Sequence, residues 1–310
     1  MTVKSNIKLE ASDYVHLHNH THYSLLDGLS KVGPLVKSVK DMGMEAVAIT
    51  DHGTMSGVIE LYKSAKSQGI KPIIGIEAYV AARSRHDREP NKDKTRYHLT
   101  MLAMNQTGYK NLMLLSTKAN LEGFYYKPRI DHELLEKYNE GLIVLSGCAS
   151  GEISQQLRID DYDKAKEIAK WYKSIFGDRY YIELQDHGHP DSPASWDVQV
   201  DLNKKLTKLA KELDIECVLT SDAHYISAED KDSHEILLCV GTGAFLSDDK
   251  RMSLKDFDLH LTDPNEIIDR WIITNPKAVA NTKTIADRCN LEIELGGILI
   301  PKFGVPKGQT

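Results

Sequence analysis

The chain has 310 residues, 41% of them hydrophobic and 27% charged, which is typical of globular proteins and excludes disordered and fibrous classes. Its net charge of −6, from 39 Lys and Arg against 45 Asp and Glu, excludes a generally basic surface for duplex DNA. No apolar run reaches the roughly 18 residues of a membrane span, so no membrane contact is expected. The four cysteines form no CxxC pair, and residues 1–10 lack the apolar core of a signal peptide. These features favour a cytoplasmic protein.

Short β-rich runs alternate with amphipathic stretches along the chain. Strands are predicted at 14–18, 45–50, 72–80, 98–104, 141–146, 179–184 and 215–221. Helices are predicted at 30–42, 57–68, 161–176, 195–213, 228–241 and 264–289. The charged stretch 83–97 lacks periodicity and is predicted to be a flexible loop at the rim. Seven strands separated by helices indicate a parallel α/β fold, and the lack of a Gly-rich fingerprint after the first strand disfavours a dinucleotide-binding sheet.

Unusual polar residues lie at the ends of nearly every predicted strand, where an α/β barrel places its active site. His16, His18 and His20 end the first strand, and their i, i+2, i+4 spacing projects three imidazoles from one face. Imidazole is a good ligand for zinc, iron and manganese. The spacing leaves open which of the three histidines bind. Asp27 follows after a short loop, and on its own such a residue is typical of a turn.

Further candidate ligands follow the other strands. Asp51 and His52 end the second strand, an arrangement typical of a metal ligand with a carboxylate that orients it. Glu77 lies inside an apolar run, where an unpaired carboxylate would be costly. The remaining candidates are His98, Cys148, Asp222 and His224. So many nitrogen, oxygen and sulfur ligands exceed the needs of one tetrahedral ion and indicate two or three metals.

In chain order these motifs are His-x-His, Thr-Asp-His-Gly, Gly-x-Glu, His, Ser-Gly-Cys and Ser-Asp-Ala-His. The sequence thereby resembles the PHP (polymerase and histidinol phosphatase) family, and within it the branch found at the N-terminus of bacterial DNA polymerase III alpha subunits. The resemblance extends from about residue 14 to 240 and is carried by HLHNHTHYSLLDGLSKV, AITDHGTMSGVIELYKSAKSQGIKPIIGIEAYV, YHLTMLA, LSGCASGEI and YIELQDHGHP. It implies a seven-stranded, distorted TIM-like (β/α) barrel over residues 1–285. Residues 286–310 would then be an exit segment toward a polymerase body.

The resemblance also implies a ligand set for three divalent metals, with zinc expected and manganese or iron as alternatives. The first metal would be held by His18, His20, Glu77 and Asp222, the second by Glu77, His98 and Cys148, and the third by Asp27, His52 and His224. His16 and Asp51 would support these ligands without binding metal. Glu77, Asp222 and His224 would be the catalytic members of the cluster.

The implied activity is phosphoester hydrolysis, and specifically a proofreading 3′–5′ exonuclease acting on a single-stranded or frayed 3′ end of DNA. The partners would be the rest of the alpha subunit and a separate proofreading subunit. Lys127 and Arg129, in an aromatic-rich loop, are candidate DNA contacts, as are His187 and His189 after the sixth strand. Two alternatives stay open: a non-catalytic, metal-stabilised docking module of the polymerase, and a small-molecule phosphatase or pyrophosphatase.

Overall fold

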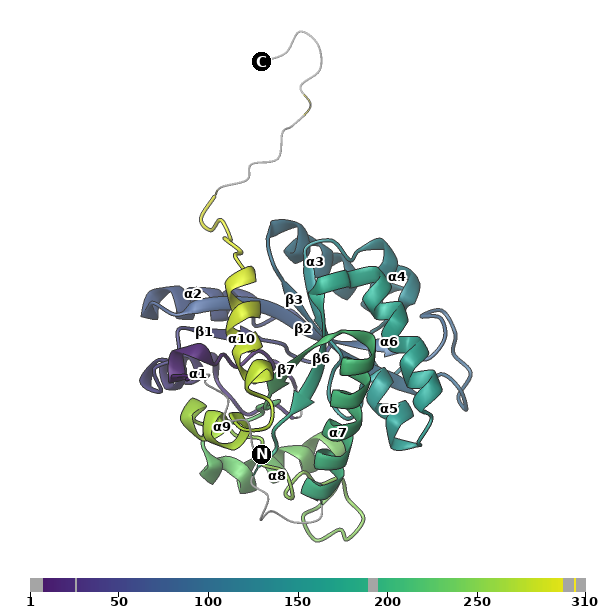
Figure 1. The fold of residues 1–310 in the computed structure, drawn as a ribbon. Coiled ribbons are helices and arrows are strands. Elements are labelled where there is room, and N and C mark those ends of the chain that lie inside the picture. The colour runs from purple at the N-terminus through teal and green to yellow at the C-terminus, as the bar shows by residue number, and fades with distance from the viewer. Residues whose placement is uncertain (1–7, 26, 189–194, 298–303, 305–310) are drawn as a thin grey trace.

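The computed structural model describes residues 8–25, 27–188, 195–297 and 304. A curled sheet runs through the centre of the molecule in the order β1-β2-β3-β5-β6-β7, and helices surround it (Figure 1). A two-residue strand, β4, pairs with β2 off this path. The strands are β1 Ala46–Ile49, β2 Lys71–Ala81, β3 Arg96–Ala103, β4 Arg129–Ile130, β5 Leu142–Leu145, β6 Tyr180–Gln185 and β7 Glu216–Thr220.

The helices include six predicted ones, one of which is divided. The α-helices are α1 Val32–Asp41, α2 Val58–Gln68, α3 Gln106–Leu121, α4 His132–Lys137, α5 Glu152–Arg158, α6 Tyr162–Phe176, α7 Ser195–Leu213, α8 Lys231–Thr242, α9 Pro264–Trp271 and α10 Pro276–Arg288. The predicted helix 264–289 is two helices because Pro276 has no N–H to donate and begins α10. Helices α3, α4 and α5 were not predicted from the sequence. In α3, the exposed Met113 and Leu114 blur the apolar stripe that identifies a helix.

The first predicted strand, 14–18, is not a regular strand, yet the segment that follows Tyr14 closes the sheet. It bridges to β1 at Val47 through His16 and to the end of β7 at Ala223 through Asn19. The Thr50 N–H donates to the carbonyl of Asn19 over 3.0 Å, and the Ala223 carbonyl accepts from His20 over 2.7 Å. The barrel-like fold is therefore confirmed, and the histidine-rich segment lies between its first and last strands.

One strand runs against the predicted direction. β3 is antiparallel to both β2 and β5, with Tyr79 opposite His98, so the expectation of an all-parallel sheet is wrong here. A parallel return requires a crossover, usually a helix, whereas residues 82–95 form a loop without one. As a result the beginning of β3, and with it His98, lies at the carboxyl ends of the neighbouring strands.

The apolar core has an inner and an outer part. Inside the curled sheet, Leu17, Ile73, Leu145 and Val218 pack together, and Cys289 at the end of α10 joins them. The packing therefore continues a few residues beyond the predicted boundary at 285. The larger, outer part lies between the sheet and the helices. At the end of the barrel that carries the candidate ligands, core residues alternate with polar ones: Leu99 follows His98, and Ala223 lies between Asp222 and His224.

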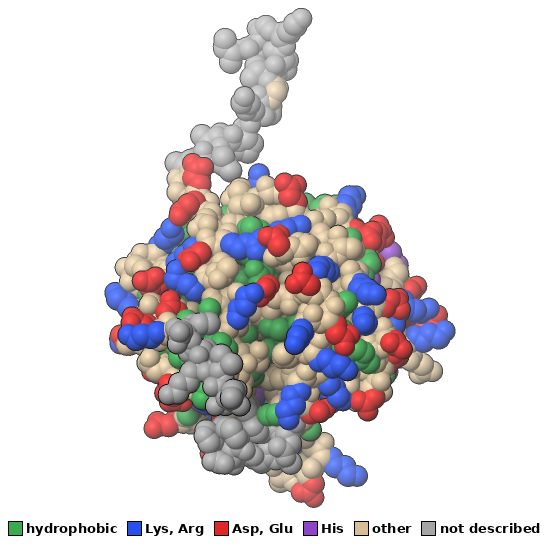
Figure 2. All heavy atoms as spheres, viewed as in Figure 1, with side chains coloured by type: hydrophobic (Ala, Val, Ile, Leu, Met, Phe, Trp, Pro, Cys, Tyr) green, Lys and Arg blue, Asp and Glu red, His purple; other side chains and the backbone are tan. Residues whose placement is uncertain are grey.

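The described helices are all too short or too polar to cross a membrane. On the face seen in Figure 2, Lys and Arg side chains are interspersed with Asp and Glu, and neither sign dominates. This agrees with the exclusion of a generally basic surface.

Candidate metal centre

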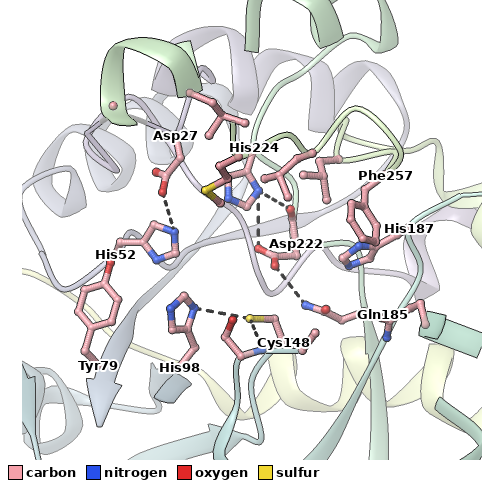
Figure 3. Close-up of a pocket in the computed structure, with 18 of the residues that line it drawn as sticks. Asp27, His52, Tyr79, His98, Cys148, Gln185, His187, Asp222, His224 and Phe257 are labelled. Atoms are coloured by element: carbon pink, nitrogen blue, oxygen red, sulfur yellow. Dashed lines mark hydrogen bonds and ion pairs between the residues drawn. The ribbon is translucent and has the colours of Figure 1, made fainter. Parts of the chain in front are cut away.

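Eight of the nine predicted ligands converge around Glu77 and Asp222 at one end of the barrel, and Asp27 joins them through His52. Six of the nine line a single pocket, which Figure 3 shows. They come from every part of the sheet. The segment before β1 supplies His18, His20 and Asp27, and the later elements supply His52, Glu77, His98, Cys148, Asp222 and His224.

Glu77 is the central carboxylate. It is 1% exposed, and its two oxygens face four imidazoles, of which His20 is the farthest at 3.8 Å. One oxygen lies 2.5 Å from Nδ1 of His52, and the other lies 3.0 Å from Nδ1 of His98 and 3.4 Å from Nε2 of His18. A carboxylate in this position can bridge two cations.

Asp222 is the second carboxylate of the cluster. Its Oδ1 lies 3.1 Å from Nε2 of His20 and 3.3 Å from Nε2 of His18. Its backbone is left-handed, with φ +49°, a conformation that costs about 1–3 kcal/mol in a non-glycine residue. Such strain persists where the surrounding structure fixes it, and it is concentrated at functional sites.

The remaining ligands surround these two carboxylates. Asp27 Oδ2 lies 3.1 Å from Nε2 of His52, and the ring of His224 stacks on His20 with centroids 4.3 Å apart. Cys148 Sγ lies 3.5 Å from Nδ1 of His98. Gly147 makes that approach possible: its φ is +82°, and a Cβ there would lie 2.4 Å from the carbonyl oxygen of His98.

Three groups of ligand atoms each lie within 4.8 Å of one another: His18 with His20 and Asp222, His52 with Glu77 and His98, and His20 with His52 and His224. Each group overlaps one of the three implied metal sets. The structure also decides which histidines of the first motif face the cluster. His16 turns away, and its Nε2 lies 2.9 Å from the carbonyl of Thr262.

The electrostatics of the cluster favour ionised carboxylates. Burial alone would raise the pKa of Glu77, but the imidazoles of His98, His52 and His18 hold that pKa well below its usual range. The same opposition lowers the pKa of Asp222, where His18 and His20 outweigh burial. Burial, together with the charges of His52 and His224, lowers the pKa of His20 to about 3, so this ring is neutral and has a free nitrogen lone pair to offer a cation. Burial and nearby Glu77 raise the pKa of the Cys148 thiol well above its usual value.

The donors fit divalent cations. Glu77 Oε2, Asp222 Oδ1, Asp27 Oδ1 and His52 Nδ1 are buried, and none makes a well-directed hydrogen bond among the described residues, although Glu77 Oε2 faces His52 Nδ1 and Asp222 Oδ1 faces His20 at ion-pair distance. Buried polar atoms normally find partners, and four unsatisfied ones in a single cluster match what metal ligands would be without their ion. A mixed nitrogen and oxygen set with one thiol suits zinc, iron or manganese.

Residues outside the candidate ligand set form hydrogen bonds with several of the candidate ligands and orient them. The Ser24 hydroxyl lies 2.9 Å from Nδ1 of His20 and donates to Asp51 over 2.7 Å, so Asp51 supports His20 through Ser24. Glu183, which was not among the predicted site residues, lies 2.6 Å from Nδ1 of His18 and is 1% exposed. The signal that could have found it is the one that identified Glu77, a carboxylate inside an apolar strand.

The candidate substrate contacts have different outcomes. Lys127 and His187 line the pocket. Arg129 does not: it is fully buried and donates to the carbonyls of Gly123, Asp93, Arg85 and Asp87, so it holds the loop 82–95 in place. The predicted DNA contact by Arg129 is therefore wrong, since its guanidinium is buried and donates its hydrogen bonds to main-chain carbonyls inside the protein. His189 lies outside the described residues.

The pocket above the cluster has a volume of about 750 Å³ and two unlike walls. The basic side chains of Arg96, Lys127 and Arg158 line it, as do the apolar Met252, Leu254 and Phe257. His52, His98, Asp222 and His224 lie between Tyr79 and Phe257 (Figure 3). A ligand in this pocket would thus meet charge, metal ligands and apolar surface at once.

Comparison with known proteins gives the family. Residues 16–187 match the PHP domain family. The DNA polymerase III subunit alpha of Treponema pallidum is 44% identical over 295 residues, covering 94% of this chain and 24% of that protein. The same subunit of Borreliella burgdorferi is 40% identical over 297 residues, covering 95% of this chain and 25% of that protein.

The chain thus spans about a quarter of the length of these curated relatives. Among solved structures, an amidohydrolase from Chromobacterium violaceum covers 68% of this chain and 87% of its own, at 14% identity and a TM-score of 0.44. The match over residues 16–187 is more than half of the chain, and it contains seven of the nine ligand positions. This chain belongs to the PHP domain family.

Proposed function

We propose that the chain is a metal-dependent phosphodiesterase, and specifically the 3′–5′ exonuclease domain of a bacterial replicative DNA polymerase III alpha subunit. Its substrate would be a single-stranded or frayed 3′ end, and its location the cytoplasm. The observation that supports this most is the complete set of nine ligand side chains at the base of a pocket with a basic wall. Relatives that are DNA polymerase III alpha subunits support the choice of DNA over a small molecule.

The chain's own residues hold the reacting groups in place. His18, His20, Asp27, His52, Glu77, His98, Cys148, Asp222 and His224 would hold two or three divalent cations. When bound, such cations lower the pKa of a water molecule and offset the charge of the phosphate oxygens. Glu77 faces two of the ligand groups and would connect them, and Asp222 fixes His18 and His20.

His224 has a defined orientation within the site. Its Nδ1 lies 2.7 Å from the main-chain carbonyl of Asp222, which leaves Nε2 free to bind a cation or to contact a substrate oxygen. A side chain held in this way has little rotational freedom to lose when the reaction begins. Cys148 of the pocket lies 3.5 Å from His98, but burial and nearby Glu77 raise the pKa of this thiol well above its usual value, which disfavours the nucleophilic thiolate, so water is the attacking group in this proposal.

The test combines metal analysis with strand polarity. Metal content is measured on the purified chain, and single-stranded DNA labelled at its 3′ or its 5′ end is then incubated with it. Asp222→Asn is the matched control, because asparagine tolerates the left-handed backbone of this position and keeps the shape of the side chain while it removes the charge and one acceptor oxygen. Stepwise loss from the 3′ end that Asp222→Asn abolishes is the expected result.

Two other outcomes would overturn the proposal. Two or three bound metals without DNA cleavage would leave the docking module of the polymerase, in which the metals only stabilise the barrel. Cleavage of a phosphomonoester such as p-nitrophenyl phosphate, with DNA untouched, would leave the small-molecule phosphatase.

A further inference from the structure

Two basic side chains of the pocket stand over the same aromatic ring. The Cζ of Arg96 lies 5.7 Å and the Nζ of Lys127 lies 5.6 Å from the ring centroid of Tyr79. Tyr79 is itself buried beside the cluster, where it stacks on His52 with centroids 5.9 Å apart and meets the edge of His98 at 5.2 Å. Cation–π contact therefore holds both charges next to two of the candidate metal ligands.

The sheet register explains why Arg96 reaches this place. Arg96 and His98 are two residues apart in β3 and so point to the same face, and β3 runs antiparallel to its neighbours. The beginning of β3 thus brings an arginine as well as a ligand to the open end of the barrel. A parallel β3 would have placed both at the other end.

The charges of Arg96 and Lys127 are uncompensated. Within the described part of the chain, no carboxylate lies within 4.0 Å of either side chain, and Arg96 donates only to the carbonyl of Lys94. The nearby loop arginines differ: Arg83 is paired with Asp93 and Glu89, and Arg85 with Asp131 and Glu122. Unpaired positive charge in a pocket attracts anions, and here it lies directly beside the place where phosphorus chemistry is proposed.

The apolar wall of the pocket fits the terminal nucleoside of a nucleic acid strand. Phe257 lies across the cluster from Tyr79 in Figure 3, and Met252 and Leu254 of the same loop extend that apolar surface. A strand end consists of a charged backbone and a terminal nucleoside whose base has an apolar face. The two walls match these two parts, with the scissile phosphate between them.

We propose that Arg96 and Lys127, held on Tyr79, form a subsite for the backbone phosphate next to the scissile one, on the upstream side of the strand. The terminal nucleoside then faces Phe257. This inference rests on the proposed function, because it requires DNA as the substrate. It assigns a direction to the strand: the chain of phosphates enters along the basic wall, and the nucleotide to be released lies against the apolar one.

The test measures binding of a fluorescein-labelled oligothymidylate by anisotropy, in EDTA so that hydrolysis cannot consume the probe. A second probe carries one uncharged methylphosphonate at the linkage next to the 3′-terminal one. The unsubstituted chain should bind the charged probe at least about tenfold more tightly, as expected for a charged hydrogen-bonded contact. The double variant Arg96→Ala with Lys127→Ala should bind the two probes equally, and its salt dependence should fall by about 0.7 per lost phosphate contact.

Two variants serve as controls. Lys94→Ala removes a neighbouring exposed cation that stands over Tyr126, outside the pocket, and should keep the preference. Arg96→Lys keeps the charge and should keep most of the preference, which separates loss of the subsite from misfolding. Absence of a preference in the unsubstituted chain, absence of DNA binding, or a preference that survives the double substitution would each overturn the proposal.

Hydrolysis is measured separately, with Mn²⁺ added, on the same oligothymidylate. A charged-probe preference that depends on Arg96 and Lys127, without any hydrolysis, would reject the exonuclease and leave the phosphate subsite standing. Hydrolysis with no such preference would reject the phosphate subsite and leave the exonuclease standing. The two proposals can therefore fail independently.

Discussion

Glu183 offers the most direct test of how the barrel supports its metal ligands. Its carboxylate is buried and accepts four hydrogen bonds: Oε1 faces Nδ1 of His18 and the Thr220 hydroxyl, each at 2.6 Å, and Oε2 faces the Gly147 N–H at 3.1 Å and the Thr100 hydroxyl at 3.3 Å. Glutamine has the same shape but only one acceptor oxygen. Glu183→Gln must therefore turn an NH₂ group toward two of these four donors.

The expected effect has two parts. Loss of acceptors in a buried network should lower the free energy of unfolding of the metal-free chain by about 1–3 kcal/mol. His18 should also become a poorer ligand, because a neutral amide raises its basicity less than a carboxylate does. Loss of such a supporting carboxylate typically lowers metal affinity roughly 10- to 100-fold. Competition with a chelator measures the affinity, and urea unfolding measures the stability.

Glu152→Gln is the matched control. Glu152 also accepts from a histidine and a hydroxyl, at 3.0 Å from His132 and 3.1 Å from Tyr172, and neither of these residues touches the cluster. This substitution should reduce stability and leave metal affinity unchanged. Equal metal affinity in Glu183→Gln and the unsubstituted chain would refute the reasoning.

Three further predictions follow from the same structure. Arg129→Met should lower the unfolding free energy by about 3 kcal/mol or more, because it leaves three buried carbonyls and the partly buried carbonyl of Asp87 without their donor; urea unfolding measures this, and a stable variant with weakened DNA binding would contradict it. The Arg83 guanidinium lowers the pKa of Asp93 to about 2 from 3.8, so this carboxylate holds the loop 82–95 above pH 4, and the hold is lost as pH falls through 2. Faster hydrogen exchange at the Glu89 amide, which donates to Asp93, would report that loss, and unchanged protection at pH 2 would count against it. Zn²⁺ or Mn²⁺ at about 100 times its Kd should stabilise the chain by about 2.7 kcal/mol in urea unfolding, and His18→Ala should remove most of that gain.

Much of the site could be predicted from the sequence because its chemistry is local. The motif His16–His20 and the buried carboxylate Glu77 are unusual in strands whatever the fold. An α/β alternation is enough to place strand ends together. These patterns, together with the family resemblance, predict nine ligands, and the structure brings all nine side chains together at one end of the barrel.

Other features depended on contacts between distant segments. The sequence does not distinguish His16 from His18, because both share one face of the segment, and only packing against Thr262 turns His16 away. Arg129 and Arg96 look equally basic in the sequence. The structure buries the first among main-chain carbonyls and leaves the second beside the pocket.

The direction of β3 shows most clearly which features follow from the local sequence and which require the tertiary structure. The sequence by itself predicts a strand at 98–104, which the structure has as β3 at 96–103, and the absence of a helical pattern in 83–97, since both are properties of short stretches. Only the tertiary structure decided that this strand pairs antiparallel with β2 and β5, because pairing is a choice among partners far apart in the chain. That choice brings His98 and Arg96 to the metal centre.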